Sequence, residues 1–186
     1  MELNAVILAG GKSSRMGQDK ALLPFKGYSS MAKYQYVRLK KIFNKVYIST
    51  KENKFDFKAD LIFDKFKESS PLVAIVSIFD ELNCDAFFLL SVDMPFVSED
   101  DIKKLIKAYK REPDFDIYCL QSSKSCEPTA TIYTKSILKE AKSMLEADNH
   151  KLQELIKRSN FKAVKSDSDE NFVNINTKEE YLLYFK

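Results

Sequence analysis

One segment, Asp85–Asp93, limits the possible folds of this 186-residue chain more than any other. Its sequence, DAFFLLSVD, is the most apolar strand candidate in the chain, and its apolar residues follow one another without polar alternation. A strand with one face in water alternates apolar and polar residues, whereas a continuous apolar run is typical of a strand buried on both faces. We therefore expect Asp85–Asp93 to lie inside a parallel sheet that helices cover on both sides.

Further strand and helix candidates alternate over the first two thirds of the chain. Short apolar runs predict strands at Val6–Leu8, Lys45–Thr50, Asp60–Asp64, 116–122 and 129–133, and a short strand or turn at 172–176. Helical spacing and the N-cap candidates Ser70, Ser98 and Thr177 predict helices at Ser30–Phe43, 70–82, Asp100–Lys110, Ser136–Ala147, Leu152–Arg158 and 177–185. This order predicts an α/β fold with a mostly parallel sheet and helices on both faces. No linker or repeat divides residues 1–186, so we expect a single domain.

Charge and composition argue against several classes of protein. The formal net charge is +3 and the charges are spread along the chain, so we expect neither a nucleic acid nor a membrane as partner. No apolar run reaches the roughly 20 residues that span a bilayer. The N-terminal sequence MELNAVILAGG lacks the basic region of a signal peptide, and we expect a cytoplasmic protein. We interpret Cys84, Cys119 and Cys126 as reduced thiols that pack in the protein, and the single His150 as a surface residue.

The loop after the first strand candidate concentrates the glycines of the chain. Three of the four glycines and three cationic side chains lie within it: Gly10, Gly11, Gly17, Lys12, Arg15 and Lys20. Glycines let the backbone approach a ligand closely, and exposed N–H groups in such a turn favour an anion. The loop fits neither the G-x-x-x-x-G-K-[ST] nor the G-x-G-x-x-G pattern. A solvated turn is the alternative, but the added positive charge favours a polyphosphate site.

Two acidic residues mark the ends of later strand candidates. Ligands of parallel α/β sheets bind outside the carboxyl ends of the strands. Asp64 ends the third strand candidate and Asp93 ends the most apolar one, so both are expected at the same edge as the Gly10-Gly11 turn. A turn-forming role is an alternative for Asp93, which precedes Met94-Pro95, and a loop-capping role explains Asp64 almost as well as ligand binding.

Five stretches of the sequence resemble the motifs of one enzyme family. LAGGKSSRMGQDK, residues 8–20, is similar to the signature L-A-G-G-x-S-x-R-M-G-x-D-K of nucleotidyltransferases with a Rossmann-like domain. FDKFKESSPLVAI, SVDMPFVS, EPTATIY and FVNINTKEEY resemble, in order, further motifs of the molybdenum cofactor guanylyltransferase family. The resemblance covers nearly the whole chain and implies a single nucleotidyltransferase domain.

The resemblance also implies a reaction and a site. GMP would pass from GTP to the phosphate of molybdopterin with release of pyrophosphate, and Mg²⁺ would be the cofactor, with Mn²⁺ as a substitute. The implied nucleotide-binding residues are Leu8, Ala9, Gly10, Gly11, Lys20, Ser49, Asp64 and Asp93. Arg15 and Lys20 would act on the triphosphate and Asp93 would hold the metal. Asn174 and Asn176 fall in the tail motif and would face the pterin, although local turn contacts explain them equally well.

Four residues depart from the family pattern. Ser49 and Ser70 stand where the family often has Asn and Gly, which bears on the choice of base. Glu127 and Lys178 replace His and Pro, which bears on the acceptor side.

Other activities and partners follow from the same resemblance. The alternatives are a cytidylyltransferase that acts on molybdopterin, a nucleotidyltransferase that acts on a sugar phosphate or phospholactate, and a nucleotide-binding module without activity. The intact Lys20 and Asp93 argue against the inactive module. Expected partners, besides GTP and molybdopterin, are other molybdenum cofactor assembly proteins and acceptor molybdoenzymes or their chaperones.

Overall fold

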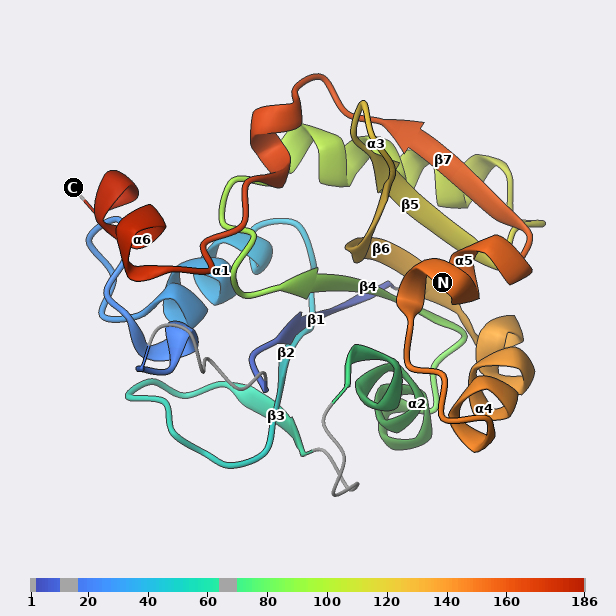
Figure 1. Cartoon of the computed structure of the whole chain (residues 1–186), viewed down its shortest axis with the longest axis horizontal. Coiled ribbons are helices and arrows are strands. Elements are labelled where there is room, and N and C mark those ends of the chain that lie inside the picture. The colour runs from blue at the N-terminus through green and yellow to red at the C-terminus, as the bar shows by residue number, and fades with distance from the viewer. Residues whose placement is uncertain (1–2, 11–16, 64–69, 186) are drawn as a thin grey trace.

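A seven-stranded sheet forms the centre of the computed structural model, which describes residues 3–10, 17–63 and 70–185 (Figure 1). The order of the strands in the sheet is β3-β2-β1-β4-β6-β5-β7. In the described part of the chain these strands are β1 (Asn4–Leu8), β2 (Val46–Thr50), β3 (Asp60–Phe63), β4 (Ala86–Ser91), β5 (Ile117–Gln121), β6 (Cys126–Thr134) and β7 (Phe161–Lys165).

The sheet is mixed but mostly parallel. Four neighbouring strands run parallel to one another, namely β3, β2, β1 and β4. The pairing of β5 with β7 is also parallel. β6 is antiparallel to both of its neighbours, β4 and β5. The predicted parallel sheet is therefore confirmed, with one reversed strand. β4, which contains most of the apolar Asp85–Asp93 segment, lies at the middle of the strand order.

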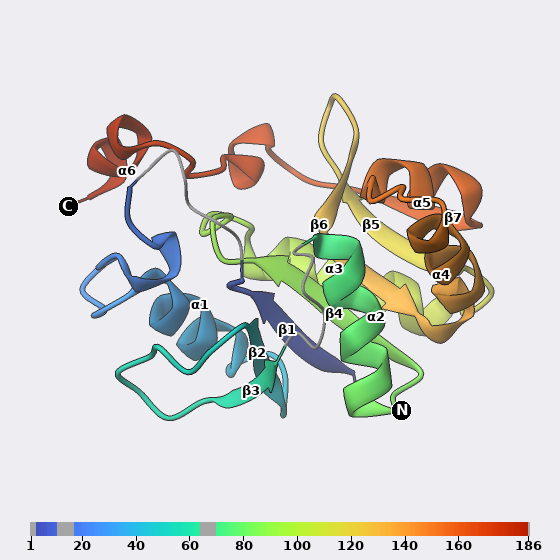
Figure 2. The ribbon, with the colours of Figure 1, turned by 60° about the horizontal axis from the view of Figure 1, so that its bottom comes forward.

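Helices cover both faces of the sheet (Figure 2). The described helices are α1 (Met31–Leu39), α2 (Pro71–Leu82), α3 (Glu99–Arg111), α4 (Leu138–Glu146), α5 (Leu152–Arg158) and α6 (Lys178–Tyr184), with the 3₁₀ helices η1 (Lys20–Leu22), η2 (Lys135–Ile137) and η3 (Asp169–Phe172). Within the described residues, no helix combines the length and the apolar character needed to cross a bilayer.

The side chains of β4 alternate between two hydrophobic cores. Phe88 and Leu90 pack in the core that includes residues of α1 and α3. Phe87 and Leu89 pack in the other core, with residues of α2, α4 and α5. All four side chains are fully buried. A strand that must fill a core on each face has no position left for a polar residue, which explains the continuous apolar run.

The three predicted helix caps are confirmed. Ser70 Oγ accepts a hydrogen bond from the backbone of Val73 at 3.2 Å, and Pro71 occupies the first position of α2. Ser98 Oγ caps α3 in the same way. At the start of α6, Thr177 and Glu180 form a reciprocal capping box. Each cap satisfies backbone N–H groups that a helix leaves unpaired in its first turn.

Several element boundaries differ from the prediction. The helix expected over Ser30–Phe43 ends at Leu39, and turns follow it. The helix expected from Ser136 starts as the 3₁₀ helix η2 before α4 begins. The strand expected at 129–133 starts three residues earlier, and 172–176 contains no strand. β7 was not predicted, because its sequence FKAVK is short, basic and only partly buried at the sheet edge.

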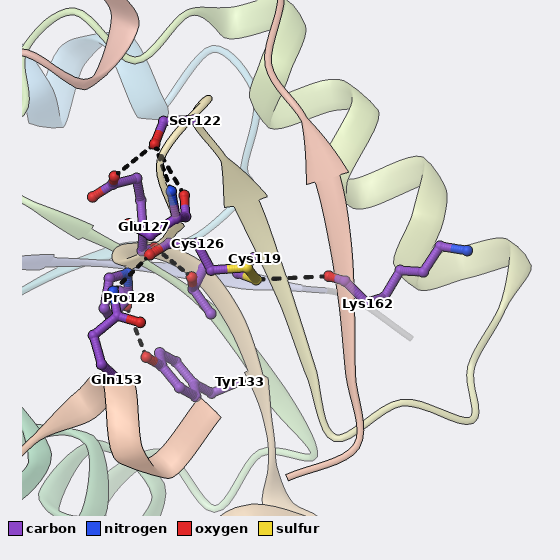
Figure 3. Close-up of a disulfide and its surroundings, with 10 residues drawn as sticks. Cys119, Ser122, Cys126, Glu127, Pro128, Tyr133, Gln153 and Lys162 are labelled. Carbon is purple, nitrogen blue, oxygen red and sulfur yellow. Dashed lines mark hydrogen bonds between the residues drawn. A yellow bond between two sulfur atoms is a disulfide. The ribbon is translucent and has the colours of Figure 1, made fainter. Parts of the chain in front are cut away.

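The structure corrects the interpretation of two cysteines. Cys119 of β5 and Cys126 of β6 form a disulfide, with 5.7 Å between their Cα atoms (Figure 3). A register shift in the pairing of β5 with β6 brings the start of β6 within reach of Cys119. Sequence spacing does not reveal such a shift, and the prediction of reduced thiols is wrong for this pair. Cys84 has a free, half-buried thiol, and burial raises the pKa of that thiol.

His150 is more enclosed than a surface residue. Its side chain is 26% exposed, and its Nδ1 lies 2.8 Å from Ser70 Oγ at the start of α2. Its Nε2 lies 3.2 Å from the carboxylate of Asp148. The loop between α4 and α5 makes this long-range contact, which the polar sequence around His150 does not predict.

Candidate functional site

The carboxyl ends of β1 and β4 lie at the same edge of the sheet, as predicted, and the carboxyl end of β2 lies beside them. Leu8 at the end of β1 lies beside Ser49 of β2 on one side and beside Ser91 of β4 on the other. The N–H of Ala9 donates to the carbonyl of Ser49 at 2.9 Å, so the hydrogen bonding continues beyond the last residue of β1. This hydrogen bond fixes the backbone at Ala9, next to Gly10.

Lys20, Asp93 and Asn176 come together although as many as 156 positions separate them. Lys20 Nζ donates to Asp93 Oδ2 and to Asn176 Oδ1, each at 2.8 Å. Lys20 begins η1, Asp93 follows β4, and Asn176 precedes α6. The side chains of Lys20 and Asp93 are 16% and 20% exposed, so their ion pair is largely but not completely shielded from water. Charge-assisted hydrogen bonds of this kind are stronger than neutral ones.

Neighbouring groups hold Asp93 in place. Ser91 Oγ donates to Asp93 Oδ1 at 2.5 Å, and the carbonyl of Asp93 accepts from the N–H of Ile175 at 2.9 Å. From α1, Gln35 Nε2 donates to the carbonyl of Met94 at 3.0 Å. Asp93 Oδ2 therefore points at Lys20 from a loop that is fixed on both sides.

Arg38, one turn after Gln35 on α1, extends this support. Its guanidinium donates to Gln35 Oε1 at 2.6 Å and 3.2 Å and to the carbonyl of Val97. Burial lowers the pKa of Arg38, because desolvation penalises its charged form. α1 thus binds the backbone of the loop after β4 through the buried side chain of Gln35 and the half-buried side chain of Arg38.

The C-terminal tail places Asn176 beside Lys20. The N–H groups of Asn176 and Thr177 donate to Glu180 Oε2 at 2.6 Å and 3.0 Å. The hydroxyl of Tyr181 donates to the carbonyl of Pro24 at 2.6 Å, which joins α6 to the segment after η1. The capping box of α6 therefore also orients the asparagine that contacts Lys20.

Asp19 and Lys54 form a second ion pair, which the sequence did not predict. Asp19 Oδ1 accepts from the N–H of Ala21 at 2.9 Å and so caps η1. Lys54 Nζ donates to Asp19 Oδ2 and, at 2.9 Å, to the carbonyl of Ala9. Gly17, two residues before Asp19, has a φ of 64°, a backbone conformation that favours glycine. The position of Asp19 in the opening motif was a signal for its role, whereas Lys54 lies outside every motif.

The remaining predicted residues divide into three groups. Ala9 and Ser49 are buried and contribute backbone groups to the edge, with Leu8 and Gly10 half-buried beside them. Asn174 is half-buried, and no hydrogen bond of its side chain is found among the described residues. Gly11, Arg15 and Asp64 lie outside the described residues.

The residues that depart from the family pattern have defined surroundings. Ser70 caps α2 and contacts His150. Lys178 is the first residue of α6. Proline, which the family has here, is also common at the first position of a helix. Glu127 is the second residue of β6 (Figure 3). Burial raises the pKa of its carboxyl, and a hydrogen bond from Ser122 partly opposes that rise. Thr129 Oγ1 lies 3.2 Å from Met94 Sδ, so this strand borders the Asp93 loop.

The donor set limits the kind of metal that this edge could hold. Among the described residues, no group of three or more His, Cys, Asp or Glu side chains has an arrangement suited to a metal ion. Asp93 supplies a single carboxylate, which already binds the ammonium group of Lys20. Mg²⁺ is often bound by one or two carboxylates together with substrate phosphates and water. Any metal ion at this edge would therefore need phosphate or water oxygens for most of its ligands.

A comparison with protein families decides the class of the protein. Residues 5–164 match the model of the MobA-like NTP transferase domain. The chain belongs to this family. The family that the motifs predicted is thus confirmed, and the protein is a nucleotidyltransferase.

Similar proteins and structures agree with this family. The molybdenum cofactor guanylyltransferase of Campylobacter jejuni subsp. doylei is 36% identical over 182 residues, which cover 97% of this chain and 94% of that protein. The protein of the same name from Helicobacter pylori (strain ATCC 700392 / 26695) is 36% identical over 190 residues, covering 96% and 89% of the two chains. The crystal structure of molybdopterin-guanine dinucleotide biosynthesis protein A from Archaeoglobus fulgidus has a TM-score of 0.81 at 19% identity and covers 98% of this chain and 96% of that one. This last likeness supports the Rossmann-like fold.

Proposed function

We propose that the protein transfers GMP from GTP to the phosphate of molybdopterin, giving molybdopterin guanine dinucleotide and pyrophosphate. The observation that carries the proposal is the meeting of Lys20, Asp93 and Asn176 at the carboxyl edge of the sheet. Each comes from a different motif of the family, and the relatives that are 36% identical bear the name of this activity. We also propose that residues 1–186 form one nucleotidyltransferase domain.

Different residues at the carboxyl ends of the strands are proposed to contact different parts of GTP. The backbone from Leu8 to Gly10 would lie against the nucleotide, because a glycine permits close approach of the backbone and exposed N–H groups favour an anion. Lys20 would donate to the triphosphate, and the predicted Arg15 would add a second cation. Ser49 and Asp64 are proposed to border the nucleoside. The buried Ser49 side chain offers a short polar group at the end of β2.

Asp93 is the residue proposed to hold Mg²⁺, for which Mn²⁺ is expected to substitute. When bound, the metal would neutralise phosphate charge during the transfer. The ammonium group of Lys20 balances the charge of Asp93 at 2.8 Å. A bound triphosphate competes for that ammonium group and exposes the Asp93 carboxylate. Lys20 and Asp93 would thus exchange partners when the substrate binds.

The transfer is a displacement at phosphorus that these residues can support. An oxygen of the molybdopterin phosphate forms a bond to the α-phosphorus of GTP, and the bond from that phosphorus to the bridging oxygen of pyrophosphate breaks. The attacking phosphate is already ionised near neutral pH, so no general base is needed. Repulsion between the two anions is the main obstacle, and Lys20 lowers it by placing positive charge beside them.

The tail of the chain is proposed to form the acceptor side. Asn176 contacts Lys20 directly, so a group bound by Asn176 lies next to the phosphate-binding cation. Asn174, two residues before it, is proposed to contact the same acceptor. Cofactor assembly proteins and acceptor molybdoenzymes or their chaperones are the proposed protein partners, because the product must be passed on.

The proposed guanylyl transfer is tested by comparing the nucleotide bases that the protein accepts. Purified protein is incubated with Mg²⁺, molybdopterin and each of the four ribonucleoside triphosphates, labelled at the α-phosphate. We expect incorporation from GTP and at least tenfold less from ATP, CTP or UTP, because guanine-binding groups would remain unpaired with another base. Equal incorporation from GTP and ATP, or a preference for CTP, would contradict guanylyl transfer.

A further inference from the structure

Lys54 lies where two parts of the proposed nucleotide site meet. Its ammonium group donates to the carbonyl of Ala9, directly after β1, and to the carboxylate of Asp19 at the start of η1. The side chain of Lys54 is 15% exposed and that of Asp19 is 31% exposed. One cation therefore joins the backbone that follows the first strand to the helix that begins with Lys20.

Packing holds Lys54 in this position. Lys54 follows β2, and its ammonium group lies 5.8 Å from the ring centroid of Phe55. The rings of Phe55 and Phe57 are 5.6 Å apart, and Phe57 packs at the same distance against Tyr36 of α1. The segment that carries Lys54 is thus attached to α1 by an aromatic row. This attachment sets the position of the Lys54 backbone relative to α1.

The contacts of Asp19 connect Lys54 to the reactive groups. Asp19 Oδ1 caps η1 while Asp19 Oδ2 binds Lys54. The next residue is Lys20, which contacts Asp93. The carboxylate of Asp19 therefore lies beside the proposed triphosphate site, where an unpaired negative charge would repel the substrate.

We propose that Lys54 is a positioning residue for the nucleotide, which fixes the backbone at Ala9 and cancels the charge of Asp19 beside the triphosphate. The inference rests on the proposed function, because it assumes a nucleoside triphosphate as the ligand. It adds a cation that lies outside the five motif-like stretches of the sequence. Loss of Lys54 should weaken nucleotide binding through charge as well as through contacts.

Calorimetric titration with GTP and Mg²⁺ can separate these two contributions. Lys54→Met should raise the Kd for GTP at least tenfold. Asp19→Asn should have a smaller effect, since Asn also caps helices well and leaves no negative charge. The double variant Asp19→Asn/Lys54→Met should bind GTP more tightly than Lys54→Met alone. Lys54→Arg should retain part of the affinity, because it preserves the charge.

Lys58→Met is the matched control, since Lys58 is an exposed lysine in the same segment. Its Kd for GTP should equal that of the wild type. Thermal unfolding of every variant verifies that the proteins compared are folded, and Lys54→Arg and the double variant keep the test informative if Lys54→Met unfolds.

Two results would overturn the inference. One is a Lys54→Met protein with wild-type affinity for GTP, and the other is a double variant that binds no better than Lys54→Met. A wild-type protein that binds no nucleoside triphosphate would instead contradict the proposed function itself.

Discussion

Replacement of Asp93 by Asn should separate nucleotide binding from catalysis. The change removes one negative charge and keeps the shape of the side chain, and an Asn oxygen can still accept the hydrogen bond from Ser91. Lys20 keeps its contact with Asn176. The Gly10 backbone and the proposed base site remain, so the variant should fold and still bind GTP.

The expected magnitudes show why activity should fall more than stability. A partly shielded ion pair such as Lys20–Asp93 contributes about 1 kcal/mol, which is small against the ~5–15 kcal/mol that stabilises a typical domain. Removal of one preorganised charge from a transition state lowers turnover by about 100-fold, or about 2.7 kcal/mol. The loss of turnover therefore cannot be explained by unfolding.

The assay is GMP transfer over a series of Mg²⁺ concentrations, with GTP binding and thermal unfolding measured separately. Turnover of Asp93→Asn should fall at least about 100-fold at each concentration, with slight recovery at high Mg²⁺ and more with Mn²⁺. Asp80→Asn is the control, since Asp80 is a half-exposed residue of α2 outside the site. Near-normal turnover of Asp93→Asn at low Mg²⁺ would refute the assignment of Asp93 as the metal-binding residue.

Substitutions at three further positions test individual contacts. Lys20→Ala should weaken GTP binding or turnover by about 1.5–3 kcal/mol, with partial rescue by Lys20→Arg, and wild-type kinetics would exclude a phosphate contact. Gly10→Val should abolish GTP binding while circular dichroism shows an unchanged fold, and unaltered affinity would contradict close backbone approach. Burial raises the pKa of the Glu127 carboxyl above its ordinary value of 4.5. Because the folded state then holds this proton more tightly than the unfolded chain does, the folded state loses stability as the pH rises from the ordinary pKa through the raised one. Glu127→Gln should therefore raise the melting temperature at neutral pH but not below about pH 4, and equal shifts at both pH values would refute this cause.

The sequence predicted the fold well where burial determines the residue pattern. The continuous apolar run of β4 indicated a strand between two cores, and Phe87 and Phe88 do pack on opposite faces. Ser70 and Thr177 marked helix starts because capping is a local interaction. β7 escaped prediction, since an edge strand with lysines buries too little to show a clear pattern.

The candidate site was predictable in its motif residues and not in its supporting contacts. Lys20 and Asp93 were expected at one edge of the sheet, and their side chains lie 2.8 Å apart. Lys54 and Arg38 were missed because each binds a backbone carbonyl that is distant in sequence. The Cys119–Cys126 disulfide was missed for a related reason, since it depends on strand register.

The measurement that tests guanylyl transfer most directly is the mass of the product. Wild-type protein is incubated with Mg²⁺, molybdopterin and GTP, and the products are analysed by mass spectrometry with a parallel assay of pyrophosphate. We predict a molybdopterin species heavier by one GMP residue, formed one-to-one with pyrophosphate. Release of free GMP without that species, or unchanged GTP in the presence of molybdopterin, would contradict the proposed function.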